Sequence, residues 1–98
     1  MFLAKVVGTV VSTRKHQAFH GSKLLLLQPR VAQPRALVPA GRSVVAIDAV
    51  GAGLDEFVMF TQGSSARLAA ATKDTPVDAI IVGIVDCVEL EGTRLERP

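Results

Sequence analysis

The stretch Ser43-Val44-Val45-Ala46-Ile47-Asp48-Ala49-Val50 is followed by Gly51-Ala52-Gly53-Leu54 and then by Glu56-Phe57-Val58-Met59-Phe60-Thr61. Two short apolar runs rich in β-branched and aromatic residues, separated by glycines, are typical of two strands joined by a tight turn. We therefore predict strands over residues 43–50 and 56–61, and a fold that is mostly β.

The rest of the chain extends this pattern. Similar runs predict strands over residues 1–13, 23–28 and 80–85, and a last short strand near residues 93–96. Residues 29–43 hold Pro29, Pro34 and Pro39, which predicts a loop with at most an irregular edge segment. Residues 63–71 are rich in alanine after two serines, which predicts a short helix capped by Ser64 or Ser65. Five strands with one short helix before the last long strand predict a small OB-like β-barrel.

Composition bounds the organisation of the chain. Its 98 residues are enough for a single domain, 1–98, of which 49% are apolar. The predicted strands 1–13 and 80–85 are apolar on both faces, so we expect other copies of the chain to cover their outer faces. No transmembrane helix or secretory signal is expected, which favours a cytoplasmic protein. A single cysteine, Cys87, excludes an internal disulfide and a multi-cysteine metal site.

Charge is distributed unevenly along the chain. Residues 1–49 carry a net charge of +6 and residues 50–98 a net charge of −4. The favoured interpretation is that the two halves pair within the fold or between copies of the chain. The alternative is an OB-like module that binds single-stranded nucleic acid. That module would use Arg14, Lys15, Lys23, Arg30 and Phe19.

Two motifs suggest ligand binding and are better explained without it. Gly51-Ala52-Gly53 lacks the third glycine of a dinucleotide-binding loop, because Glu56 stands in its place, and a strand rather than a helix follows. We interpret it as a tight turn with positive φ. His16 and His20 have a spacing that suits zinc on a helix, but they lie in a polar segment without helical periodicity. Exposed loop histidines are the favoured interpretation.

Other candidate groups also favour structural roles. Ser64-Ser65 lacks the flanking glycines of a nucleophile elbow, and Cys87 lies in an apolar run that suits a structural thiol. Asp48 and Asp86 could act as an acid–base pair, which leaves a small-molecule-binding or enzymatic subunit as a second alternative. We rank it lowest, because Val, Ile and Leu are expected to fill the barrel and leave no deep polar pocket.

Taken in order, five blocks of sequence resemble one family over nearly the whole chain. The family is that of the pentameric vertex proteins of bacterial microcompartments, of the EutN/CcmL type. The blocks are Val7-Gly8-Thr9-Val10-Val11 with Thr13-Arg14-Lys15-His16; Gly21-Ser22-Lys23-Leu24-Leu25 with Gln28-Pro29; Val45-Ala46-Ile47-Asp48-Ala49-Val50-Gly51-Ala52-Gly53 with Glu56; Gly63-Ser64-Ser65-Ala66-Arg67; and Pro76-Val77-Asp78-Ala79 with Val82-Gly83-Ile84-Val85-Asp86. Where the family usually has a further glycine, this chain has Asp55.

The resemblance implies a structural role. It implies a homopentamer that caps the vertices of a roughly icosahedral shell beside hexameric shell proteins, in the bacterial cytoplasm. It also implies no enzymatic activity, no cofactor, no metal, and no nucleic-acid or membrane partner. The residues expected at the subunit interface or ring centre lie in two motifs: Gly51, Ala52, Gly53 and Glu56, and Ser64, Ser65, Ala66 and Arg67.

Overall fold

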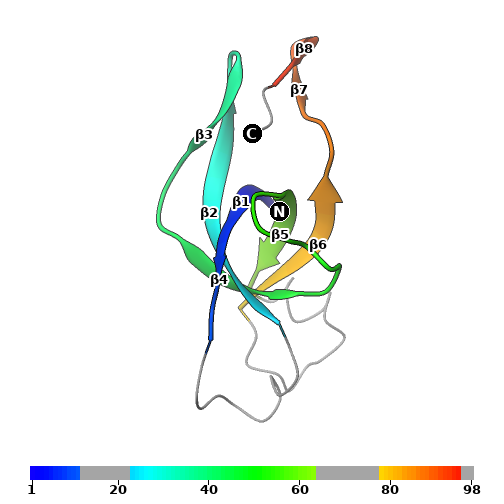
Figure 1. Cartoon of the computed structure of the whole chain (residues 1–98). Helices are drawn as coiled ribbons and strands as arrows, with labels where there is room; N and C mark the ends of the chain where they lie inside the picture. The colour runs from blue at the N-terminus through cyan, green and yellow to red at the C-terminus, as the bar shows by residue number, and fades with distance from the viewer. Residues whose placement is uncertain (12–22, 64–77, 96–98) are drawn as a thin grey trace.

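The computed structural model describes residues 1–11, 23–63 and 78–95, and these contain eight strands (Figure 1). The predicted mostly β class is confirmed. The strands are β1 (Phe2–Thr9), β2 (Leu24–Gln33), β3 (Ala36–Pro39), β4 (Val44–Asp48), β5 (Phe57–Gln62), β6 (Ala79–Val85), β7 (Glu89–Leu90) and β8 (Thr93–Arg94).

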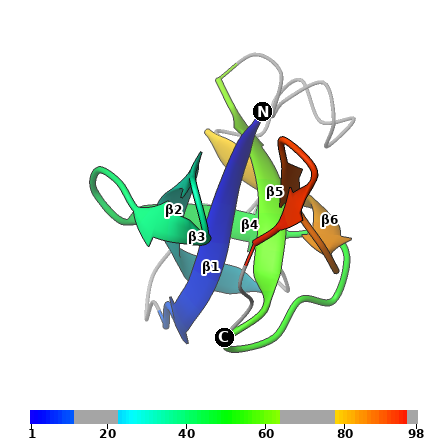
Figure 2. The same ribbon diagram turned by 90° about the horizontal axis from the view of Figure 1, so that it is seen from above.

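Five of the strands pair in a closed cycle. The order β1-β5-β6-β4-β2 returns to β1, because β1 also pairs with β2, and β3 is added outside β2. Figure 2 shows β1 between β5 on one side and β2 on the other. All pairings in the cycle are antiparallel except that between β4 and β6. Both edges of each of these strands therefore contribute to the cycle.

Side-chain alternation places the main core inside the cycle. Leu25 and Leu27 of β2 are buried, while the alternating Leu24 and Leu26 are partly exposed. The main cluster collects residues from all five strands and from the turn after β4: Ala4, Val6, Leu25, Leu27, Ala46, Ala52, Val58, Phe60, Ala79 and Ile81. The fold is thus held together by small and branched aliphatic side chains, as the composition indicates.

A second cluster covers the outside of β1. Leu37 of β3, Phe57 and Leu95 form it, and the partly buried Leu3 of β1 packs against them. Leu95 follows the β7–β8 hairpin and its amide donates to the carbonyl of Val88 at 2.8 Å. Part of the apolar outer face that we expected other copies to cover is therefore covered by the chain itself.

The predicted loop over residues 29–43 is wrong, because β2 continues through Pro29 to Gln33 and turns into β3. Pro34 and Arg35 form the two-residue turn, with φ of 82° at Arg35. Proline at the first and positive φ at the second central position describe a type II turn. Pro39 ends β3, where a missing N–H interrupts no ladder.

The structure confirms most of the remaining secondary-structure predictions and leaves one of them untested. The predicted strands 43–50, 56–61 and 80–85 are confirmed within two residues at each end, and the predicted strand 23–28 is the first part of β2. β8 confirms the short strand near residues 93–96. The predicted strand 1–13 is observed as Phe2–Thr9. The predicted helix in residues 63–71 lies almost wholly outside the described residues.

The β7–β8 hairpin and the β2–β3 hairpin rise at the same end of the strand cycle (Figure 1). Glu91 and Gly92 join β7 to β8 with φ of 51° and 81°, the type I′ geometry that suits two-residue hairpins. Beside this hairpin, Arg94 Nε donates to Sγ of Cys87 at 3.0 Å, and this hydrogen bond raises the pKa of Arg94. Cys87 is half-buried, which suits the structural role expected for it.

Candidate subunit interface

The turn after β4 is built on the carboxylate of Asp48. Its Oδ1 accepts hydrogen bonds from the amides of Val50 at 3.0 Å and Gly51 at 3.1 Å. An aspartate that binds amides two and three residues further on stabilises a turn in this way. Gly51 has φ of 81°, which confirms the positive φ predicted for this glycine motif.

A lysine immediately before β2 binds the same turn. Lys23 Nζ donates to the carbonyl of Ala52 at 2.7 Å and lies 3.5 Å from Oδ2 of Asp48. Burial of the Asp48 carboxylate by itself raises its pKa, but the amides of Val50, Ala52 and Gly51 and the charge of Lys23 together outweigh burial and lower it. The side chain of Asp48 is only 2% exposed, so it is an ionised group held inside the subunit.

The second half of the turn is hydrogen-bonded to β1. Glu56 Oε1 accepts from the amide of Gly53 at 2.6 Å, and the Glu56 amide donates back to the carbonyl of Gly53 at 3.2 Å. The amide of Asp55 donates to the carbonyl of Val6, and the amide of Val6 donates to the carbonyl of Glu56, both at 2.9 Å. Lys5 lies 3.6 Å from the exposed carboxylate of Asp55. Residues 48–56 are thus held by hydrogen bonds at both ends.

Asp55 adopts φ of 69°, a left-handed conformation in which glycine is the favoured residue and aspartate is tolerated. The resemblance seen in the sequence leads us to expect glycine at this position. Aspartate at position 55 therefore fits the backbone conformation that a glycine would adopt there.

The predicted interface residues of this turn divide into buried and exposed groups. Ala52 is fully buried in the subunit's own core, and Glu56 is half-buried and engaged with Gly53. Gly51 is exposed, beside two exposed apolar side chains, Val50 at 40% and Leu54 at 66%. Leu54 was not predicted as an interface residue, although a leucine directly after a glycine turn is a signal visible in the sequence. The second predicted motif, Ser64, Ser65, Ala66 and Arg67, lies outside the described residues.

The two alternative sets of functional residues are not brought together in the described chain. Of the nucleic-acid set, Lys23 is engaged by Asp48, and Arg30 donates to the carbonyl of Leu37 at 3.2 Å with its guanidinium over the ring of Phe57. Arg14, Lys15 and Phe19 lie outside the described residues, as do His16 and His20.

Asp48 and Asp86 do not form an acid–base pair. The parallel register of β4 and β6 places Asp48 opposite Ile81. Asp86 comes five residues later along an extended strand, which corresponds to roughly 16 Å. Among the described residues, no group of three or more His, Cys, Asp and Glu side chains could hold a metal.

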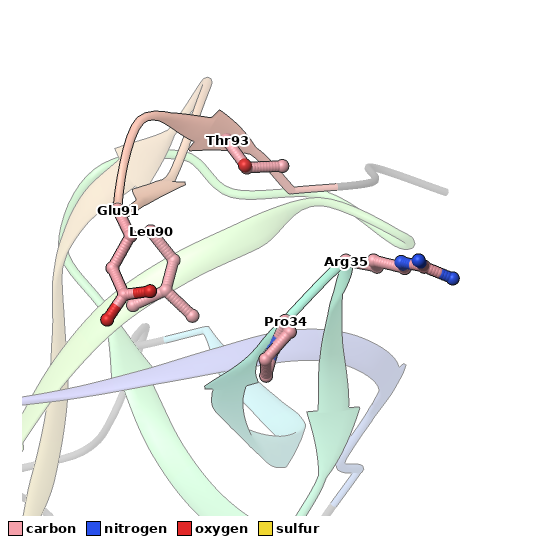
Figure 3. A pocket seen from close by; sticks show the side chains of 5 residues that line it. All are labelled: Pro34, Arg35, Leu90, Glu91 and Thr93. Atoms are coloured by element: carbon pink, nitrogen blue, oxygen red, sulfur yellow. The ribbon is translucent and has the colours of Figure 1, made fainter.

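A groove lies between the tips of the two hairpins (Figure 3). Its volume is about 220 Å³, and Pro34, Arg35, Leu90, Glu91 and Thr93 line it. The Arg35 side chain points away from that of Glu91, so the two charges do not converge on a common point. Small-molecule sites are usually larger and hold convergent polar groups. No membrane-crossing helix occurs in the part of the chain that the structure describes.

The closed cycle of strands and the hydrogen-bonded turn after β4, which exposes Val50 and Leu54, define a small β domain. The profile of the family described as "Ethanolamine utilisation protein EutN/carboxysome" matches residues 1–86. The carboxysome shell vertex protein CcmL of Gloeobacter violaceus is 44% identical over 95 residues, which are 97% of this chain and 92% of that protein. The bacterial microcompartment shell vertex protein GrpN of Rhodospirillum rubrum is 46% identical over 89 residues, 91% of this chain and 97% of that protein.

Solved structures agree with these relatives. The structure of Gloeobacter violaceus CcmL matches with a TM-score of 0.86 and 43% identity, over 99% of this chain and 97% of that one. A structure described as the GrpN pentameric microcompartment shell protein matches with a TM-score of 0.78 and 44% identity, over 92% of this chain and 98% of that one. The chain belongs to the EutN/CcmL family, so the resemblance seen in the sequence is confirmed. The relatives are structural shell proteins, which agrees with the expectation of a protein without enzymatic activity.

Proposed function

We propose that this chain is a structural shell protein that forms homopentamers and caps the vertices of a bacterial microcompartment in the cytoplasm. The observation that carries the proposal is the 44% identity to a shell vertex protein across nearly the whole chain, with a matching fold. A relative of similar identity is described as a pentameric shell protein. The vertex role also implies hexameric shell proteins as the neighbours of the pentamer.

The closed cycle of strands supports the interpretation of the fold as an OB-like barrel. In a ring of identical subunits, one surface of each copy meets a different surface of the next. We assign the exposed part of the turn after β4 to one such contact, because its hydrogen bonds fix its shape before assembly and so reduce the ordering cost of association. Gly51, Ala52, Gly53 and Glu56 shape this turn, and Ser64, Ser65, Ala66 and Arg67 are proposed to complete the interface or the ring centre.

Native mass spectrometry of the purified chain tests the pentamer. A mass five times that of the single chain is the expected result, and a stable monomer at micromolar concentration would contradict it.

Co-expression with a hexameric shell protein tests the vertex role. Hexamers alone tile flat sheets, whereas closure requires points of five-fold symmetry. Closed polyhedral particles should therefore form with the chain, and open sheets or tubes without it, as seen by electron microscopy. Open structures in both samples would contradict the vertex role while leaving the pentamer in place.

A further inference from the structure

The outward face of three neighbouring strands is apolar. Leu26 of β2 pairs with Val45 of β4 and with Gly8 of β1, and Leu24 pairs with Ile47 on the same face. Their neighbours along each strand, such as Leu25 and Ala46, point into the core. The register of β1 and β2 slips between Val6 and Gly8, which makes Val7 a bulge residue beside this face. We call this face the outer patch: Val7, Leu24, Leu26, Val45 and Ile47.

The outer patch is accessible in the single subunit. Val45 is 49% exposed and Val7 is 42% exposed, while the other three members are half-buried. None of the five side chains carries a charge. An outer sheet face that meets water is normally polar, so this face has the composition of a contact surface.

Glycine at position 8 leaves a hollow over Leu26. A Cβ built on Gly8 would lie 3.8 Å from Cβ and 3.9 Å from Cδ2 of Leu26, which is ordinary van der Waals contact. The backbone of Gly8 does not have positive φ, so the fold of the subunit does not require glycine there. A strand interior normally disfavours glycine. The glycine lies next to the bulge at Val7, and its missing Cβ leaves the side chain of Leu26 uncovered at this point.

We infer that the outer patch is an interface on which a second copy of this chain packs, with an apolar group seated in the hollow between Gly8 and Val45. The inference rests on the proposed function, and it extends the contact expected on the outer face of residues 1–13 to the outward faces of β2 and β4. A second copy is the occupant because a relative of 44% identity is described as pentameric, and each copy in such a ring needs two different contact faces. The chain's own Leu95 covers the outside of β1 only at the other end, near Leu3.

Val45→Asp tests the inference, with Val31→Asp as the matched control. Val31 has a similar exposed fraction, 45%, but lies on β2 near the tip of the β2–β3 hairpin, away from the outer patch. A charge buried without a partner weakens association strongly, so Val45→Asp should raise the concentration for half-assembly by about a hundredfold or more. Val31→Asp should assemble as the wild type does. Equal assembly of both variants and the wild type would overturn the inference.

Gly8→Ala is a gentler test, because its methyl group fits the single subunit and occupies only the hollow. Circular dichroism should show an unchanged fold, while assembly weakens by about tenfold. Assembly of Gly8→Ala at the wild-type concentration would count against a contact in the hollow.

Footprinting of the wild-type protein with hydroxyl radicals keeps the inference testable if Val45→Asp does not fold. Read out residue by residue, Leu26 and Val45 should be protected in the assembled protein and modified after dilution to the monomer, while Val31 is modified in both. Modification of Val45 in the intact pentamer would overturn the inference. Protection in the monomer as well would also overturn it, because the chain itself would then cover the patch. A wild-type chain that never assembles would instead refute the proposed pentamer.

Discussion

Replacement of Asp48 with alanine should destabilise the subunit by about 2–3 kcal/mol. The substitution removes two hydrogen bonds from the amides of Val50 and Gly51. Each contributes roughly 1 kcal/mol, because these amides lie in an exposed turn where water can replace the carboxylate. Loss of the contact to Lys23 adds about 0.5 kcal/mol, since the lysine is half exposed.

Urea unfolding at one fixed protein concentration measures this loss. The concentration must be fixed because dissociation of an assembly contributes to the apparent stability. With a typical slope of about 1–3 kcal/mol per molar urea, the midpoint of Asp48→Ala should fall by roughly 1–2 M. Asp48→Asn is the matched control, because it keeps an acceptor oxygen for the two amides and loses only the charge. It should cost less than half as much.

The stability difference between the wild type and Asp48→Asn should also depend on pH. The pKa of Asp48 is lowered in the folded protein, so the unfolded chain binds more protons over the acid range. The contribution of the charge is therefore complete above the unfolded pKa of about 4 and is lost as the pH falls through the lower folded value. An Asp48→Ala variant within about 0.5 kcal/mol of the wild type at neutral pH would refute the reasoning.

Three further substitutions test other parts of the structure. Gly51→Ala should lower the free energy of unfolding in urea by about 1 kcal/mol, because φ at this position is 81° and the added Cβ contacts no other atom. An unchanged urea midpoint would mean that the turn adopts another backbone conformation. Leu95→Ala should cost about 2–4 kcal/mol, since the side chain is 2% exposed and packs with Leu37 and Phe57; a loss below 1 kcal/mol would show that this cluster contributes little. Arg67→Ala should weaken assembly in native mass spectrometry, and an unchanged ring with an unchanged melting temperature would remove Arg67 from the proposed interface.

The strands were predictable where apolar runs ended at glycine. Residues 43–50 and 56–61 form β4 and β5, joined by a turn in which Gly51 has positive φ. The failure over residues 29–43 has a physical cause, because proline disrupts a strand only where its missing N–H is needed. Pro34 lies in the turn and Pro39 at the end of β3, so neither removes a hydrogen bond from the sheet.

The candidate site was predictable only in part. The glycine turn was visible in the sequence. The contacts of Lys23 with Asp48 and Ala52, which stabilise this turn, were not, because Lys23 is distant along the chain. Surplus apolar surface was also predictable in kind. The position of this surplus surface was not predictable, because Leu95 covers the outside of β1 near Leu3, while Val45 of β4 is left exposed.

Among the strands of the six-stranded sheet, only β3 has a single neighbour, and this limits how copies of the chain can grow into larger objects. It spans four residues and ends in Pro39, which offers no N–H to an incoming strand. Fibre growth by backbone pairing at this edge is therefore disfavoured even at the high local concentration inside a crowded lattice. At this edge, copies are favoured to meet through side chains, a mode of contact that can stop at a closed ring.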